Sequence, residues 1–402
     1  MRSFARFTST VAAMLLGATQ GQAQSTAADS AARDSTARAS AAASAGAAPA
    51  GTAPTAKDSG RLVSSTGPIA SPIVIYSPET GYGGGAGLVW VRVSDTPGQR
   101  PTTFNTSFIA TETSQFSFVG NADVWTEGNQ RRFTTELTVQ RAPNKFFGIG
   151  PWQDGPSERF VPSTMRIIQT IQQRIRPHFF LGLRYFAEST KLDDIKPGPI
   201  KQGLVPGSPN GWYLSTISAL ITWDTRDRYY VPLNGTNAQM QITRADRLLG
   251  SEFSYYRMVF DVRHYESLGG EHSLALQFYA DGSGGGLPPF ERMPRLGGKD
   301  MVRGFFQGQL RDKFVTAFTA EYRSAPWFGD AGWQWWRLSG VAFAALGGVS
   351  PTLTGFEGAA ARFAGGVGLR IALTRPDRLN LRIDRGWGRG SAATYFTVGE
   401  AF

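Results

Sequence analysis

The chain has 402 residues, of which 12% are aromatic and 48 are glycine, and it carries a formal charge of +10. This length allows one large domain or two ordinary ones, and the composition is that of an ordered protein. The absence of cysteine excludes disulfides, thiol catalysis and thiolate metal sites, and it is compatible with an oxidising compartment. Lysine and arginine are scattered as single residues along alternating segments, so we expect no nucleic-acid binding.

The N-terminal segment is typical of an export signal. Arg2 and Arg6 form a basic start, a short apolar stretch follows at 11–18, and a small-residue cleavage site ends the expected signal peptide, residues 1–23. The next segment, residues 24–68, consists mostly of Ala, Ser, Thr, Gly and Pro. Such a composition has too little apolar surface to offset the entropy of ordering, so it predicts a disordered tether.

Periodicity decides the class of the remaining chain. No apolar run after residue 23 approaches the roughly 20 residues that a membrane-spanning helix needs, which leaves a secreted all-β protein or a transmembrane β-barrel. From residue 69 onward, short alternating runs broken by Gly, Pro, Asn and Asp indicate many antiparallel strands. Residues 133–140, 273–280 and 363–373 each have one apolar face and one small, polar or charged face.

We interpret this alternation as an all-β, antiparallel transmembrane barrel over residues 69–402. A soluble sandwich would bury the apolar face against a second sheet, and its strands are usually shorter. The export signal, aromatic residues near turns, and strand lengths near the roughly 9 to 11 residues of a tilted membrane strand favour the barrel. Sixteen strands are expected, near residues 69–76, 82–93, 103–112, 114–126, 131–141, 164–176, 178–189, 213–223, 235–244, 253–265, 272–281, 313–323, 337–346, 363–373, 378–385 and 394–402.

Strand parity supports this count. Both ends of a bacterial barrel normally lie in the periplasm, and its long loops face outward. With sixteen strands the long connections all fall on one side, which is then extracellular: 142–163, 190–212, 282–312 and 347–362.

The connection 282–312 contains the run Val302-Arg303-Gly304-Phe305, which we call the latch motif. In an ordinary surface loop this arginine would be solvated. The neighbouring strands place Glu321 and Asp384 on the lumen face, because the apolar residues that alternate with them face lipid. A desolvated guanidinium requires such a carboxylate, and a bidentate pair fixes its orientation. We therefore expect the loop to fold into the lumen, with Asp384 and Glu321 as the acidic partners of Arg303.

Several short motifs follow one another in a specific order through this region. They are Tyr76–Gly81, Phe146–Gly150, Trp223–Asp227, Leu296–Gly298 with the latch motif, Glu321–Arg323, Gly366–Arg370, Arg382–Asp384 and Gly399–Phe402. Each motif alone is weak, but the ordered set resembles the BamA/TamA superfamily of outer-membrane barrels over residues 69–402.

This resemblance implies a location and a set of roles. The protein would lie in the bacterial outer membrane, in contact with its lipid. Arg303 would lie inside a sixteen-stranded barrel and pair with an inward acid, for which Asp384 is the closest match. The first and last strands would meet at a weak seam that can open sideways. Phe402 would be the C-terminal aromatic that the outer-membrane assembly machinery reads, although Glu400 interrupts the alternation of that strand.

The family also implies a task, which is outer-membrane assembly or the transport of proteins or lipids by local perturbation of the membrane. Its partners would be a client barrel protein or a periplasmic protein. Members that insert or export proteins carry periplasmic polypeptide-transport-associated domains before the barrel, and residues 24–68 leave no room for one. We therefore expect a barrel-only member.

Two other functions stay open. One is a passive channel or surface antigen whose lumen the loop plugs, and the more remote one is a barrel hydrolase. The chain has only three histidines, His178, His264 and His272, and it has neither a Gly-x-Ser-x-Gly elbow nor a His-Glu-x-x-His zinc motif. We expect no enzyme activity, no metal site and no cofactor.

Overall fold

The computed structural model describes residues 69–77, 81–92, 99–100, 102–112, 115–151, 157–228, 231–328, 337–355, 361–372 and 380–402. The expected signal peptide and tether lie outside these ranges. Within them, no helix has both the length and the hydropathy needed to cross a membrane.

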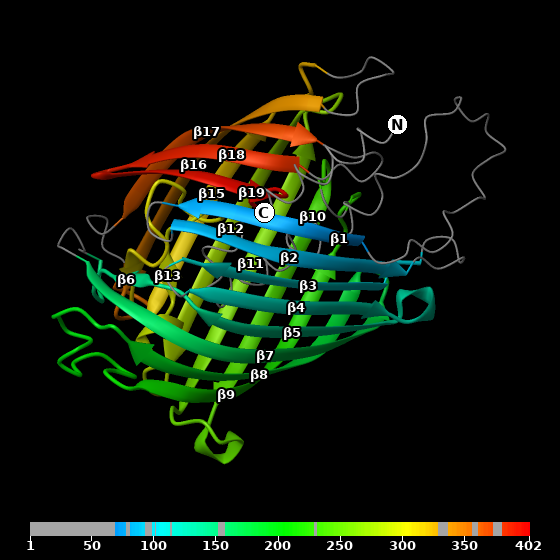
Figure 1. Ribbon diagram of the computed structural model, residues 1–402. Helices are drawn as coiled ribbons and strands as arrows, with labels where there is room; N and C mark the ends of the chain where they lie inside the picture. The colour runs from blue at the N-terminus through cyan, green and yellow to red at the C-terminus, as the bar shows by residue number, and fades with distance from the viewer. Residues whose placement is uncertain are drawn as a thin grey trace.

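Sixteen long strands in the described residues form one antiparallel sheet, which curves around a central space (Figure 1). Each pairs with the next long strand along the chain. The expected all-β architecture and strand count are confirmed. The long strands are β1 (Ile69–Ser77), β2 (Gly81–Arg92), β3 (Thr102–Thr111), β4 (Phe116–Trp125), β5 (Arg131–Arg141), β7 (Glu158–Arg176), β8 (Phe179–Asp193), β9 (Gly211–Asp224), β10 (Gly235–Ala245), β11 (Tyr255–Ser267), β12 (Ser273–Gly284), β15 (Phe314–Arg323), β16 (Arg337–Ser350), β17 (Arg362–Ala372), β18 (Asn380–Gly388) and β19 (Ser391–Val398).

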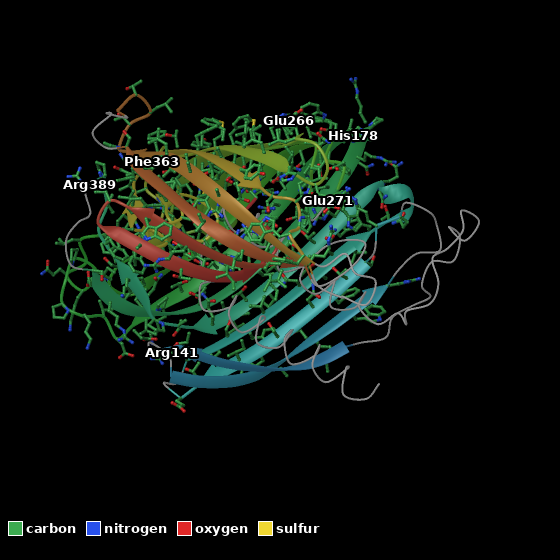
Figure 2. The ribbon with its side chains drawn as sticks, turned by 90° about the horizontal axis from the view of Figure 1, so that it is seen from above. Arg141, His178, Glu266, Glu271, Phe363 and Arg389 are labelled. Atoms are coloured by element: carbon green, nitrogen blue, oxygen red, sulfur yellow. The ribbon has the colours of Figure 1, made fainter. Side chains whose placement is uncertain are left out.

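The two ends of the barrel differ in the length of their connections. Figure 2 shows Arg141 and Arg389 at one end and His178 and Glu271 at the other. Because consecutive strands are antiparallel, the connections after β5, β8, β12 and β16 all leave the sheet at the Arg141 end. We call this the extracellular end and the opposite one the periplasmic end.

At the extracellular end some strands continue past the ends expected from the sequence. β7 begins at Glu158 and β8 continues to Asp193, and a short strand, β6 (Asn144–Phe146), pairs with the start of β7. Phe160 and Leu192, on these extensions, pack in one buried cluster with Ile200 from the connection after β8. Backbone groups that this cluster shields from water must be paired, so the ladder of hydrogen bonds continues beyond the expected strands.

The last strand ends earlier than expected. β19 stops at Val398 rather than at 402. Gly399 adopts a φ of 86°, which favours glycine, and its N–H donates to the carbonyl of Asn380 at 2.7 Å. Residues 400–402, which we call the tail, leave the sheet and are buried. The expected strand 394–402 was therefore wrong at its end, because Glu400 joins ion pairs inside the barrel instead of continuing the alternation.

The outer face of the sheet is apolar and exposed, whereas the inner face is polar. Met165, Leu183 and Phe363 are 60%, 60% and 63% exposed. On the inner face, Glu136 and Arg370 are buried. Apolar side chains at this density on an exposed sheet require lipid around them, and the polar lumen is then enclosed.

The connection between β12 and β15 fills part of this lumen. It forms a two-stranded hairpin of β13 (Arg295–Leu296) and β14 (Leu310–Arg311). Its apolar residues make one buried cluster with inward residues of the barrel wall; the cluster contains Val259, Tyr279, Leu296, Met301, Val302, Phe305, Leu310, Val315, Ala317, Ala345, Val349 and Ala364. The expected lumen loop is thus part of the core.

We predict that the loss of stability caused by a charge on the outer face depends on how deep the residue lies in the membrane. Leu183→Arg, near the middle of the membrane part of β8, should destabilise the inserted barrel by about 2–4 kcal/mol, because a desolvated guanidinium would face lipid. Ser189→Arg, on the same face of β8 closer to the extracellular end, should cost at most about 1 kcal/mol. The measurement is the denaturant midpoint in lipid vesicles. Equal losses in the two variants would contradict this orientation of the membrane.

Candidate functional site

The latch motif forms a tight turn next to β19. Val302 has a φ of 44°, which is unusual for a β-branched residue, and Gly304 has a φ of 128°. The N–H of Gly304 donates to the Tyr395 hydroxyl at 3.4 Å, and that hydroxyl donates to the carbonyl of Phe305 at 2.8 Å. A strained turn persists only when its surroundings hold it, and here one hydroxyl of β19 binds two of its backbone groups.

Arg303 extends from this turn between two strands. Its Nη1 lies 2.5 Å from Asp384 Oδ2 on β18, and its Nη2 donates to Glu321 on β15. The guanidinium lies 3.5 Å from the ring centroid of Phe343. The arginine side chain is 1% exposed and both acids are 0% exposed. The structure therefore brings Arg303 to both of its expected acidic partners.

These ion pairs continue into a closed ring of buried charges. Arg370 donates to Asp384 at 2.6 Å and to Glu400 at 2.7 Å. Arg323 donates to Glu321 at 2.9 Å and lies 3.9 Å from Glu400. The ring consists of three arginines, Arg303, Arg323 and Arg370, and three acids, Glu321, Asp384 and Glu400. Each guanidinium lies next to at least two of the carboxylates, and each carboxylate lies next to at least two of the guanidinium groups. This alternation offsets the large cost of removing the charges from water.

A further arginine ties the loop to β18. Arg382 donates to Asp300 at 3.0 Å and to the carbonyl of Lys299 at 3.1 Å, both in the loop. Its Nε donates to the Thr397 hydroxyl on β19 at 2.7 Å. The loop is thus held to β18 and β19 on both sides of Val302.

The close approach of the loop to β18 depends on glycine. A Cβ on Gly386 would lie 2.5 Å from the carbonyl oxygen of Arg303, and one on Gly388 would lie 2.5 Å from the Phe305 ring. β18 therefore presents bare backbone to the latch motif. Larger side chains at these positions would displace the turn.

The outer part of the loop has separate anchors. Arg292 donates through Nε to Glu188 on β8 at 2.8 Å, and Arg311 donates to the carbonyl of Phe290 at 2.7 Å. Burial lowers the pKa of Arg311 from its usual value, and the nearby Glu291 carboxylate opposes this shift. The ring of Phe290 packs edge-on against Trp212 and lies in the aromatic cluster at the extracellular end.

Phe402 lies off the sheet. It is 3% exposed, its carbonyl accepts from Arg323 at 2.9 Å, and it packs in a small cluster with Tyr265, Ala275 and Ala401. Its role as a signal read by the assembly machinery stays a prediction.

Several members of the charge network were not among the predicted site residues. Arg370 and Arg382 fall on the lumen face of their strands, which is the signal that could have identified them. Glu400 had a stronger signal, since a glutamate that breaks an apolar alternation needs a partner. Tyr395 also falls on the lumen face, since it alternates with Phe396 and Val398, whereas Asp300 lies in the loop and carries no such signal.

The described residues offer no metal site, because no group of three or more His, Asp or Glu side chains in them could hold an ion. The histidines lie near the periplasmic end. His178 contacts the carbonyl of Asp224 and His272 contacts the Tyr322 hydroxyl.

We predict that Arg303→Ala weakens the resistance of the barrel to heat and detergent by about 3–5 kcal/mol, because Glu321 and Asp384 lose a buried counter-charge. Asp384→Asn should also destabilise it. The double variant should lose less than the sum of the two single losses, since both remove the same ion pair. The measurement is the denaturant or thermal midpoint, and Arg385→Ala, at an exposed position of β18, is the control. Full additivity would contradict the pairing.

We also predict that Gly386→Ala displaces the latch motif. The new Cβ would clash with the Arg303 carbonyl, so a loss of about 1–3 kcal/mol is expected. The matched control is Gly365→Ala on β17, where the nearest atom to a Cβ is the Phe343 carbonyl oxygen at 3.6 Å. The readouts are the thermal midpoint and protease cleavage within residues 285–313. Identical behaviour of both variants would show that the loop does not rest on β18.

Comparison with known proteins agrees with this geometry. The model of the Omp85 superfamily domain matches residues 91–402. The fold is similar to BamA from Haemophilus ducreyi lacking POTRA domains 1–3, with 14% identity and a TM-score of 0.54 over 83% of this chain and 69% of that one. It is also similar to CdiB from Acinetobacter baumannii, with 12% identity and a TM-score of 0.50 over 83% of this chain and 59% of that one. No curated protein matches the sequence.

At these identities the solved structures show a likeness of fold alone. The family match is independent of them and covers the chain from the end of β2 to Phe402. The resemblance expected from the motifs and the location in the bacterial outer membrane are both confirmed. The chain belongs to the Omp85 superfamily of outer-membrane β-barrels.

Proposed function

We propose that this barrel acts in outer-membrane assembly, or in the transport of proteins or lipids, by perturbing the membrane beside its first and last strands. The observation that carries the proposal is the attachment of the loop. Arg303 binds Asp384 on β18, and Gly304 binds Tyr395 on β19. A movement of the loop would therefore be transmitted to the last two strands.

The edges of the sheet support this role. β1 pairs with β2 from Ile69 opposite Val89 to Ser77 opposite Gly81, and β18 pairs with β19. Among the described residues, no hydrogen-bonded register joins β1 to β19. Edge strands carry unpaired backbone groups, which can accept a strand of another chain.

A passive channel or surface antigen is the alternative. Pore formation requires a continuous path, and the lumen holds a polar cavity of about 130 Å³ lined by Asn105, Glu136, Arg184, Gln241 and Asp261, among others. At the extracellular end, however, the aromatic cluster around Phe290 and the lumen loop pack against the barrel wall. This packing favours a lumen that is blocked at the extracellular end. A hydrolase stays the remote alternative, and we expect no catalysis.

The partners follow from this role. We propose that residues 1–23 direct export and that residues 24–68 form a tether in the periplasm. The barrel would contact outer-membrane lipid and require the assembly machinery for its own insertion. Its partner would be a client barrel protein or a separate periplasmic protein.

The test is reconstitution into lipid vesicles with an unfolded client barrel. We predict that the protein accelerates folding of the client, and that Arg303→Ala reduces this acceleration, because the loop is no longer coupled to β18. Gly365→Ala is the control and should act as the wild type does. Steady ion conductance without any effect on client folding would contradict the assembly role and support the channel.

A further inference from the structure

A small pocket lies at the periplasmic end of the barrel, next to the tail. Its volume is about 50 Å³. The periplasmic ends of β12, β15, β16, β17 and β18 form its walls, together with part of the connection between β9 and β10. Figure 2 shows Glu271, which lines it, at this end of the molecule.

The walls of the pocket are basic. Four arginines line it, Arg228, Arg323, Arg337 and Arg370, against two glutamates, Glu271 and Glu400. Arg337 lies 3.1 Å from Glu271, and Arg370 donates to Glu400 at 2.7 Å. Three further carboxylates contact these arginines from outside the walls: Glu321 on Arg323, Asp384 on Arg370 and Asp227 on Arg228. The residues of the walls themselves carry more positive than negative charge, whereas the carboxylates behind them offset this excess.

Three buried donors of these walls have no hydrogen-bond partner in the described part of the chain. They are Ser273 Oγ, Arg323 Nη1 and Arg370 Nη2. Their residues are 0%, 5% and 1% exposed, and all three line the same pocket. Arg370 Nη2 lies 3.7 Å from Glu321 Oε1, which is an ion-pair contact but too long for a hydrogen bond. Buried donors without an acceptor are costly, and three that share one pocket indicate a common acceptor.

We propose that this pocket binds a small oxoanion, the phosphate or carboxylate group of a periplasmic ligand. A cavity of only about 10–15 Å³ is enough to hold one water molecule. The pocket volume of about 50 Å³ is therefore large enough for a group with several oxygens. An oxoanion would accept from the serine hydroxyl and from both guanidinium groups at once. Because Arg323 also donates to the carbonyl of Phe402, the bound anion and the tail share one arginine.

The proposal is tested by calorimetric titration of the intact protein in detergent micelles with inorganic phosphate and, separately, with acetate, at constant ionic strength in chloride. We expect saturable binding of one anion per chain. Tighter binding of phosphate would identify a phosphorylated ligand, and tighter binding of acetate a carboxylate. Absence of saturable binding of either anion would overturn the proposal, because the pocket would then hold only water.

Two variants locate the binding. Ser273→Ala removes the unpaired hydroxyl and adds no atom, so the thermal midpoint without anion should be kept while affinity falls about tenfold. Arg228→Gln changes a side chain that is 47% exposed and should lower affinity about fivefold. Ser117→Ala is the matched control, since Ser117 Oγ is also buried and unpaired but lies outside this pocket. Unchanged affinity in both pocket variants, or an equal loss in the control, would overturn the assignment.

Discussion

A buried guanidinium cannot remain unpaired, and this constraint organises the barrel around Arg303. The arginine comes from a loop that has little regular structure of its own. It is held because Asp384 and Glu321 project inward from β18 and β15 and because Phe343 covers its face. The cost of bringing these groups out of water is large, so the loop has one position in which all of them are satisfied.

The rest of the lumen has an apolar region and a charged region, and the loop contributes to both. Near the extracellular end the loop contributes apolar residues to a core that the barrel wall alone could not form. Below it, alternating guanidinium and carboxylate groups connect the loop to β15, β17, β18 and the tail. The sheet therefore surrounds an apolar half and a charged half of the lumen, and the loop contacts both.

Much of this arrangement could be predicted from alternation along the chain. A period of two identifies strands and also says which residues face inward, so Glu321 and Asp384 could be assigned to the lumen before their partner was located. Features that depend on loop packing could not be predicted in this way. Glu188 and Arg292 are separated by 104 positions, and no periodicity relates them. Alternation does not predict the inward turn of the tail, because Glu400 only interrupts the strand pattern and its ion-pair partners, Arg323 and Arg370, lie on other strands.

The ring of buried charges also sets an order of events. Arg303, Arg323 and Arg370 all precede Asp384 and Glu400 in the chain. During synthesis and export the early arginines therefore have only one of their final counter-charges, Glu321, until the last two strands arrive. The charge balance of the loop in the lumen therefore depends on β18 and the tail, which supply Asp384 and Glu400. A chain truncated before β18 would leave the three arginines of the ring with Glu321 as their single carboxylate, so a loss at the C-terminus would act on a loop residue 81 positions before Asp384.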